Sequence, residues 1–284
     1  AKTLGHLLKY ASIHGRYPGE VKVDGDARII EGKRIPVLAE KDPSKLPWKS
    51  LGADVILECT GKFTTKEEAS KHIAAGAKKV LISAPAKGHD GTFIIGVNCG
   101  QYDKSKHHVI SIGSCTTNCL APVAKVLLDN FGIVKGFMTP IHAYTADQRL
   151  QDAPHKDLRR ARAAALSMVP TTTGAAKAIA ECLPVLKGKL DGVAIRVPTP
   201  DASLVDLAVI LEKEVTVQQL NDAFRKAAAS GPLSKTLEYT EDPIVSIDIV
   251  GNPHGSIVDG GLTAASGNMA KVFAWYDNEW AFSC

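Results

Sequence analysis

The 284-residue sequence contains no run of 18 apolar residues and does not open with a signal peptide, so it predicts no membrane-spanning helix. Its net charge is only +4, which is too small to indicate nucleic acid as a partner. Six scattered cysteines make no disulfide framework, and this pattern favours a reducing, cytoplasmic compartment. Cys115 and Cys119 lie one helical turn apart, but no second metal-binding pair accompanies them, so we expect no metal site.

What is present is typical of a globular protein of about two domains, with 45% hydrophobic and 23% charged residues. A helix is expected at the N-terminus, followed by a hairpin that turns at Asp24-Gly25. Apolar strands then alternate with turns and a helix, and the expected elements are strands at 55–59, 80–83, 93–97 and 109–112 and a helix at 65–75. This alternation predicts an α/β fold with a doubly wound (Rossmann) parallel sheet.

After residue 132 long strands dominate. The expected strands are 134–144, 191–198, 203–213, 244–250 and 269–276, and the expected helices are 158–168, 172–184 and 216–229. This order predicts an α+β domain on a large, mainly antiparallel sheet.

Cys115 lies between an apolar strand and a helix, where free amides and the helix dipole favour a thiolate. Lowering a thiol pKa from about 8.5 to about 6 requires roughly 3.4 kcal/mol, and a helix terminus supplies only about 0.3–1 kcal/mol. A nearby imidazolium must therefore supply most of the rest, and His142, on an expected strand beside a polar run, is the best candidate among nine histidines. The alternatives are an inert, buried cysteine and a histidine that only fills the core.

Two other patterns indicate anion binding. Thr171-Thr172-Thr173-Gly174 opens a helix, where hydroxyl and amide groups bind phosphate, although threonines also serve as plain caps. Arg196 is a charge within an apolar strand, and such a residue is usually paired or directed at a ligand. The basic residues of the polar stretch 145–170 form either a solvated face or an interface.

Several long motifs together resemble phosphorylating glyceraldehyde-3-phosphate dehydrogenase, and they follow in the family's order along the whole chain. They are Ser-Cys-Thr-Thr-Asn-Cys at 114–119, His-Ala-Tyr-Thr at 142–145, Asp-Leu-Arg-Arg-Ala-Arg-Ala-Ala at 157–164, Pro-Thr-Thr-Thr-Gly-Ala-Ala-Lys at 170–177, Arg-Val-Pro-Thr-Pro at 196–200 and Trp-Tyr-Asp-Asn-Glu-Trp at 275–280.

The resemblance implies oxidation and phosphorylation of glyceraldehyde 3-phosphate to 1,3-bisphosphoglycerate in glycolysis or gluconeogenesis. It makes Cys115 the nucleophile that carries a thioester and His142 its base. It implies phosphate sites for the substrate and for inorganic phosphate at Ser114, Thr116, Thr145, Thr173, Gly174 and Arg196. It implies NAD contacts at Lys41, Thr60, Gly61, Phe63, Ser83 and Asn278. Finally, it implies a homotetramer in which Arg160 lies in a loop against a neighbouring subunit's cofactor.

The sequence departs from the family by lacking Gly-x-Gly-x-x-Gly, the first strands and the closing helix. We therefore expect a truncated chain, with residues 1–114 as an incomplete NAD-binding domain and residues 115–284 as the catalytic domain. A non-catalytic binding or scaffolding remnant is one alternative, and erythrose-4-phosphate dehydrogenase is another, although the intact Thr-Thr-Thr-Gly-Ala-Ala-Lys motif argues against the latter. Ala153-Pro154 lies where the family distinguishes NAD from NADP, and it leaves NADP open.

Overall fold

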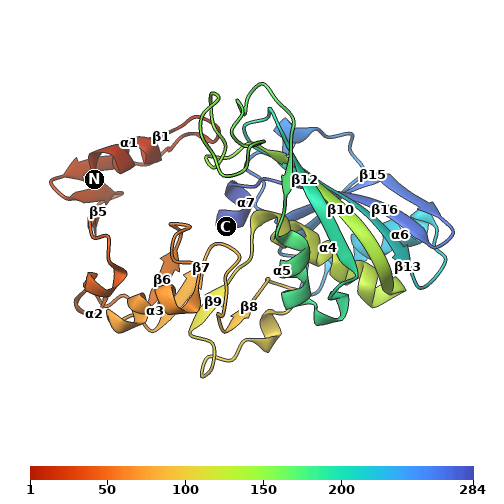
Figure 1. Cartoon of the computed structure of the whole chain (residues 1–284), viewed down its shortest axis with the longest axis horizontal. Helices are drawn as coiled ribbons and strands as arrows, with labels where there is room; N and C mark the ends of the chain where they lie inside the picture. The colour runs from red at the N-terminus through yellow and green to blue at the C-terminus, as the bar shows by residue number, and fades with distance from the viewer.

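A seven-stranded mixed sheet dominates the second half of the chain in the computed structural model, which describes residues 1–284 (Figure 1). Its strand order is β11-β12-β10-β13-β16-β15-β14, and only the β10–β12 and β14–β15 pairs are parallel. The bounds are β10 (Ile133–Ala143), β11 (Val169–Thr172), β12 (Leu190–Val197), β13 (Ser203–Leu211), β14 (Leu237–Thr240), β15 (Ser256–Ser266) and β16 (Met269–Tyr276). The prediction of a large, mainly antiparallel sheet is confirmed.

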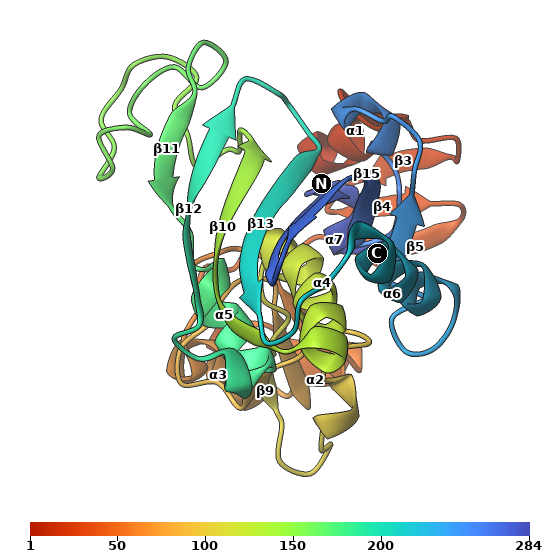
Figure 2. The same ribbon diagram turned by 90° about the vertical axis from the view of Figure 1, so that its right-hand side faces the viewer.

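Three helices cover one face of this sheet, namely α4 (Cys115–Phe131), α5 (Ala175–Cys182) and α6 (Val217–Ala229) (Figure 2). The apolar side of α4 brings Leu120 and Leu127 against alternate residues of β13, such as Leu207 and Leu211, and all four are fully buried. Burying each such side chain stabilises the fold by roughly 1.5–3 kcal/mol. The core therefore holds the first turn of α4, which begins with Cys115, against the sheet.

A four-stranded parallel sheet precedes α4, in the order β6-β7-β9-β8. Its elements are β6 (Val55–Glu58), β7 (Lys79–Ile82), β8 (Gly91–Thr92) and β9 (Val109–Ser111), with the helices α2 (Trp48–Leu51) and α3 (Lys66–Ala74). A capping box between Thr65 and Glu68 begins α3, as the sequence predicts. Because these strands are parallel, the turns after β6, β7 and β9 all lie at one edge of the sheet, which is where α/β sheets bind ligands.

The first forty residues form a small unit that lies apart from the parallel sheet in Figure 1. It consists of α1 (Lys2–Lys9), β1 (Tyr10–Ala11), β2 (Gly15–Arg16), β3 (Val21–Asp24), β4 (Ala27–Ile30) and β5 (Lys33–Pro36). The predicted hairpin joins β3 to β4, and Gly25 supplies the positive φ of 56° that the turn requires.

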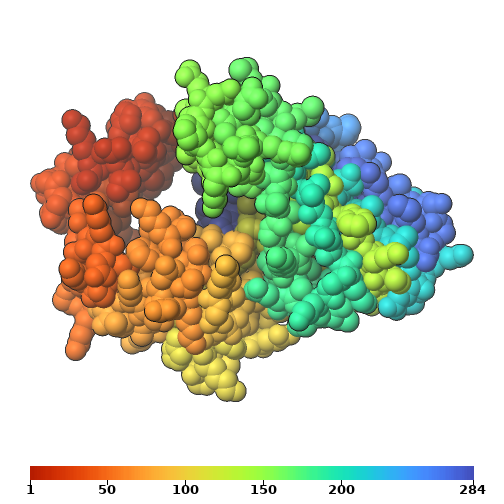
Figure 3. All heavy atoms as spheres, in the orientation of Figure 1, coloured from red at the N-terminus to blue at the C-terminus, as the bar shows by residue number.

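A hollow separates three parts of the surface (Figure 3). The N-terminal unit, the parallel-sheet region and the segment 145–168 surround it, and the C-terminal residues, which include α7 (Trp280–Ser283), lie at its back. The carboxyl edge of the parallel sheet therefore lies close to the end of the large sheet. No helix is at once long enough and apolar enough to cross a bilayer.

The predicted strand at 93–97 is wrong. Strand β8 ends at Thr92, and the next residues form a turn with Gly96 at a φ of 79°. The side chain of Asn98 closes this turn, because its Oδ1 accepts from the Ile94 amide at 2.8 Å and its Nδ2 donates to the Thr92 carbonyl at 2.8 Å. A side chain that satisfies two backbone groups competes with strand pairing.

Two predictions in the second half are also wrong. Residues 158–168 form turns, not a helix, and 244–250 contains the 3₁₀ helix Ser246–Ile249 in place of a strand. The long strand β15 was missed because Gly260-Gly261 interrupts its apolar pattern, and its register with β16 shifts between Asp259 and Ala264.

Candidate active site

Cys115 occupies the first position of α4, directly after the turn that follows β9. Ser114 caps this helix, because its Oγ accepts a hydrogen bond from the Thr117 amide at 3.2 Å. Gly113 has a φ of 70°, a conformation that a larger residue adopts only with strain. The sharp turn therefore presents Cys115 at the helix N-terminus, as the sequence predicts.

His142 lies beside this thiol, with its Nε2 3.4 Å from Cys115 Sγ. The same ring contacts the Ala143 carbonyl oxygen through Nδ1 at 2.7 Å. A contact this short requires a proton on Nδ1, so Nε2 carries the lone pair and faces the sulfur. The pair has the geometry of a nucleophile and its base.

Burial opposes the predicted lowering of the thiol pKa. It raises the pKa of Cys115, against the lowering effects of the Thr116 amide and the Arg196 guanidinium. Burial, followed by the charge of Arg196, lowers the pKa of His142 to about 4. Considered one at a time, both groups are therefore neutral at pH 7, and their mutual contact is the interaction that favours a thiolate and an imidazolium together.

Arg196 lies next to His142 because strands β10 and β12 pair with these two residues in register. Its Nη1 donates to the Ala143 carbonyl at 3.2 Å and to Thr145 Oγ1 at 3.1 Å. No carboxylate pairs with Arg196, and its buried Nε has no hydrogen-bond partner. A desolvated guanidinium with free donors is suited to an anion such as a phosphate ester.

The other residues predicted for phosphate lie at two helix starts. Thr116 is buried in the first turn of α4, and its hydroxyl is 2.9 Å from the hydroxyl of the buried Tyr276. Thr173 and Gly174 lie at the start of α5, where Thr173 Oγ1 accepts from the Ala175 amide at 3.2 Å. That bond is local to the turn before α5, and neither Thr173 nor Gly174 makes a hydrogen bond to Cys115.

The predicted cofactor residues gather mainly at the carboxyl edge of the parallel sheet. The Thr60 amide donates to Glu58 Oε1 at 2.8 Å, and the Ser83 amide donates to the Glu58 carbonyl at 3.1 Å. Gly61 follows Thr60 with a φ of 68°. Phe63 instead packs edge-on against His72, and Lys41 is exposed with no hydrogen bond to this turn.

Asn278 follows β16 and is the predicted contact for the nicotinamide carboxamide. Ser203 Oγ donates to Asn278 Oδ1 at 2.6 Å, and the same Oγ accepts from the Ala143 amide at 3.0 Å. The amide nitrogen of Asn278 has no partner within the protein. A buried side chain that is fixed at its oxygen and free at its nitrogen fits a carboxamide acceptor.

The segment 145–168 is held to the sheet by polar contacts of its own. Arg160 pairs with Asp147, and its Nε donates to Thr171 Oγ1 at 2.9 Å. Thr171 Oγ1 in turn donates to Asp157 Oδ2 at 2.7 Å. Within one chain Arg160 therefore has a structural role, and its predicted contact with a neighbouring subunit stays a prediction.

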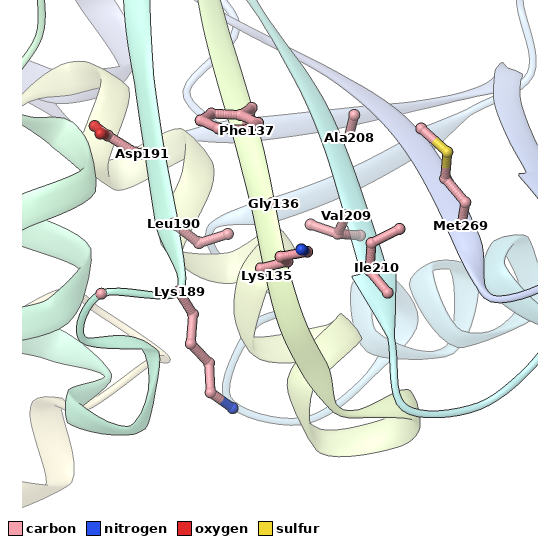
Figure 4. Close-up of a pocket in the computed structure, with 11 residues that line it drawn as sticks. Lys135, Gly136, Phe137, Lys189, Leu190, Asp191, Ala208, Val209, Ile210 and Met269 are labelled. Carbon is pink, nitrogen blue, oxygen red and sulfur yellow. The ribbon is translucent and has the colours of Figure 1, made fainter.

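An apolar depression of about 400 Å³ lies away from these residues (Figure 4). It is on the outer face of the large sheet, opposite α4, and Phe137, Ile210 and Met269 are among its lining residues. None of the residues predicted for the site lines this depression.

Comparison with known proteins decides the family. The family model for the C-terminal domain of glyceraldehyde 3-phosphate dehydrogenase matches residues 114–278, and the model for its NAD binding domain matches residues 1–66. Glyceraldehyde-3-phosphate dehydrogenase of Geobacillus stearothermophilus is 58% identical over 284 residues, which are 100% of this chain and 84% of that protein. The chain belongs to the glyceraldehyde-3-phosphate dehydrogenase family. Enzymes of the same name are 58% identical in Streptomyces coelicolor, over 99% of this chain and 84% of that protein, and in Mycolicibacterium smegmatis, over 99% and 83%.

Membership in the glyceraldehyde-3-phosphate dehydrogenase family confirms the resemblance stated from the motifs. The structure adds three neighbours of the site that the sequence argument did not assign, and these are Glu58, Ser203 and Tyr276. A lone acid at the end of an apolar strand was the available signal for Glu58. Tyr276 stood inside a quoted motif, but only the structure reveals its contact with Thr116.

Proposed function

We propose that this chain oxidises glyceraldehyde 3-phosphate and phosphorylates the product to 1,3-bisphosphoglycerate, as in glycolysis and gluconeogenesis. The observation that carries the proposal is the contact of the half-buried Cys115 with the buried His142, with Arg196, which has no carboxylate partner, beside them. NAD is the cofactor, in keeping with the match of residues 1–66 to the family's NAD binding domain.

Cys115 begins the reaction by attacking the aldehyde carbon through Sγ. His142 Nε2, at 3.4 Å, takes the thiol proton and gives it to the carbonyl oxygen, which yields a hemithioacetal. His142 then takes the proton back from that oxygen while the C–H bond breaks, and the carbon becomes a thioester. Bound NAD supplies the acceptor for the hydride.

Inorganic phosphate completes the reaction when its oxygen attacks the thioester carbonyl and the C–S bond breaks. The Cys115 thiolate leaves and takes a proton from His142, which returns both residues to their starting state. We propose Arg196 and Thr145 for the phosphate of the substrate, because Arg196 already donates to Thr145 and keeps its Nε free. For the attacking phosphate we propose the residues at the two helix starts, which are Ser114, Thr116, Thr173 and Gly174.

We propose that NAD is held by Lys41, Thr60, Gly61, Phe63, Ser83 and Asn278. Of these, Thr60, Gly61 and Ser83 lie at the carboxyl edge of the parallel sheet, where α/β sheets bind dinucleotides. Correspondingly, we propose residues 1–114 as the cofactor-binding part and residues 115–284 as the catalytic part. A reducing, cytoplasmic compartment would keep the thiol of Cys115 active.

An assay of NADH formation tests this function. The protein should reduce NAD with glyceraldehyde 3-phosphate only when phosphate is present, and Cys115→Ser should abolish turnover. Cys119→Ser is the matched control, because this buried thiol contacts only Ser256 and backbone carbonyls. An inactive protein, a Cys115→Ser variant that keeps its rate, or a preference for erythrose 4-phosphate contradicts the proposal.

We also propose that the chain forms a homotetramer. The outer face of the large sheet leaves Phe137 71% exposed, and the segment 145–168 ends in apolar side chains that include Leu158 and Leu166, at 81% and 85%. Exposed apolar side chains of this size suit a contact with a second copy of the chain. Sedimentation should give a tetramer, and Phe137→Asp should shift it to smaller species. A monomer before the substitution contradicts the proposal.

A further inference from the structure

His14 joins the N-terminal unit to the end of the large sheet. Its Nε2 is 3.1 Å from Asp277 Oδ2 and 3.3 Å from Asp201 Oδ2, and its ring packs on Trp280 with centroids 5.4 Å apart. Among residues 1–40, His14 alone makes a hydrogen bond or ion pair with the catalytic part. This contact is therefore the polar link between the N-terminal unit and the catalytic part.

The two carboxylates lie on the turns that carry the support of Asn278. Asp201 comes two residues before Ser203, and Asp277 comes directly before Asn278. The hydrogen bond from Ser203 to Asn278 joins these same two turns. His14 thus contacts both turns through Asp201 and Asp277. The separation of these turns determines where the amide of Asn278 lies.

Without His14, the carboxylates would repel each other. Asp201 is 2% exposed and Asp277 is fully buried. Burial and the neighbouring charge of Asp277 raise the pKa of Asp201 to about 6. The Gly251 amide donates to Asp277 Oδ2 at 2.8 Å, whereas Asp201 Oδ2 has no hydrogen-bond donor and only the 3.3 Å ion-pair contact with His14 Nε2. The donor at His14 Nε2 is the group that offsets the repulsion.

We propose that His14 is a positioning residue for hydride transfer, which holds Asp201 and Asp277 together and thereby fixes the amide of Asn278. This inference rests on the proposed function, since Asn278 is given its part in orienting the cofactor there. His14 acts through Asn278 and does not touch the reacting atoms. The N-terminal unit thus contributes a side chain to the geometry of a site that lies in the other part of the chain.

The first test measures hydride transfer apart from later steps. Mixing the protein with saturating NAD and glyceraldehyde 3-phosphate without phosphate should give a burst of NADH. His14→Ala should slow the burst by about 10- to 100-fold, the loss typical of a displaced positioning group, and His14→Gln, which keeps a donor, should recover part of the rate. His254→Ala is the matched control. His254 forms an ion pair with Glu238, with 2.9 Å between Nδ1 and Oε2, and makes no hydrogen bond or ion pair with a residue proposed for the site. An unchanged burst in His14→Ala overturns the inference.

Two double variants separate positioning from a general loss of structure. Adding Asp201→Asn to His14→Ala removes the repulsion and should restore part of the burst rate. Adding His14→Ala to Asn278→Ala should slow the burst no further, because His14 acts through Asn278. The inference is wrong if the burst rate does not recover when Asp201→Asn is added to His14→Ala. It is also wrong if the losses of His14→Ala and Asn278→Ala multiply in the double variant.

NAD affinity, measured by calorimetry on the same variants, distinguishes the two failures. His14→Ala should weaken NAD binding, and the effect should vanish in the Asn278→Ala background. If the protein binds NAD but gives no burst of NADH, the proposed reaction is wrong. The NAD affinities of His14→Ala, Asn278→Ala and the double variant then decide whether His14 acts through Asn278. A protein that does not bind NAD refutes both.

Discussion

Replacing Arg196 by methionine should change the enzyme's preference between phosphorylated and unphosphorylated aldehydes. The guanidinium lies beside His142, it is desolvated, and it has neither a carboxylate partner nor a partner for Nε. Methionine keeps much of the buried aliphatic volume while removing every donor. The substitution also removes the charge of Arg196 beside Cys115 and His142, but both aldehydes feel that loss, so a comparison of the two aldehydes reports the interaction of Arg196 with the substrate's phosphate.

The magnitude follows from the bonds that are lost. A hydrogen bond to a charged group contributes about 1.5–3 kcal/mol, and this corresponds to a loss of roughly 10- to 150-fold in kcat/KM for glyceraldehyde 3-phosphate. Unphosphorylated glyceraldehyde cannot make this contact, so its kcat/KM should change little. The ratio of the two constants should accordingly fall by about the same factor.

Steady-state assays with both aldehydes, at saturating NAD and phosphate, measure this ratio. Arg162→Met is the control, because Arg162 is exposed and pairs only with Asp152. An equal loss for both aldehydes would assign Arg196 to the support of His142 and would refute its role in phosphate binding.

Three further substitutions test contacts of the parallel sheet and of the site. Burial would raise the pKa of Asp90, but contacts with Lys66 and with the His108 and Val109 amides outweigh it and hold this pKa at about 2. Because the pKa is depressed, its stabilising effect is full above about pH 4 and is lost as the pH falls through 2. Asp90→Asn should therefore lower the free energy of unfolding in urea by roughly 2 kcal/mol at pH 7 and by much less near pH 2. Tyr276→Phe should lower the free energy of unfolding in urea by about 1–2 kcal/mol, because it leaves the buried Thr116 hydroxyl without its partner. An unchanged midpoint of urea unfolding would contradict this. Glu58→Gln places an amide where the Thr60 amide and hydroxyl now donate, so the KM for NAD should rise while kcat changes little, and a fall in kcat alone would count against it.

Hydrophobic periodicity and capping residues were sufficient to predict the strand and the helix on either side of Cys115. The apolar run of β9, the cap at Ser114 and the helical spacing of α4 are local features, and the structure has each of them. The errors at 93–97 and 244–250 arise where apolar residues are followed by a turn that a side chain or a short 3₁₀ helix closes. Periodicity carries no information about such closures, because they depend on one residue, such as Asn98.

The sequence singled out the three residues that the structure brings together, but it did not predict their electrostatics. Motif order brought forward Cys115, His142 and Arg196, and strand register explains why the latter two are adjacent. Burial is a property of the assembled fold. The sequence therefore indicates the effects of the helix dipole and the imidazole on the pKa of Cys115, but not the effect of desolvation. The links from His14 and Ser203 to Asn278 were hidden for the same reason, because they join segments far apart in the chain.

The state of the Cys115 thiol depends on a balance that substitution of His142 should disturb. Burial raises the pKa of the Cys115 thiol and lowers the pKa of the His142 imidazole to about 4, so ionising the two groups separately is unfavourable at pH 7. Opposite charges 3.4 Å apart regain roughly 5 kcal/mol at an effective dielectric constant of 20, and the helix N-terminus adds about 0.3–1 kcal/mol. The contact with the imidazolium is therefore the largest contribution that offsets the burial of the thiolate, and His142→Gln removes it. Alkylation of Cys115 by iodoacetamide at pH 7 should slow by at least 10-fold in this variant, with the inflection of its pH–rate profile shifted to higher pH. Alkylation at an unchanged rate and pH dependence would mean that the helix terminus and Arg196 alone sustain the thiolate, and that the contact between sulfur and imidazole has no part in activating it.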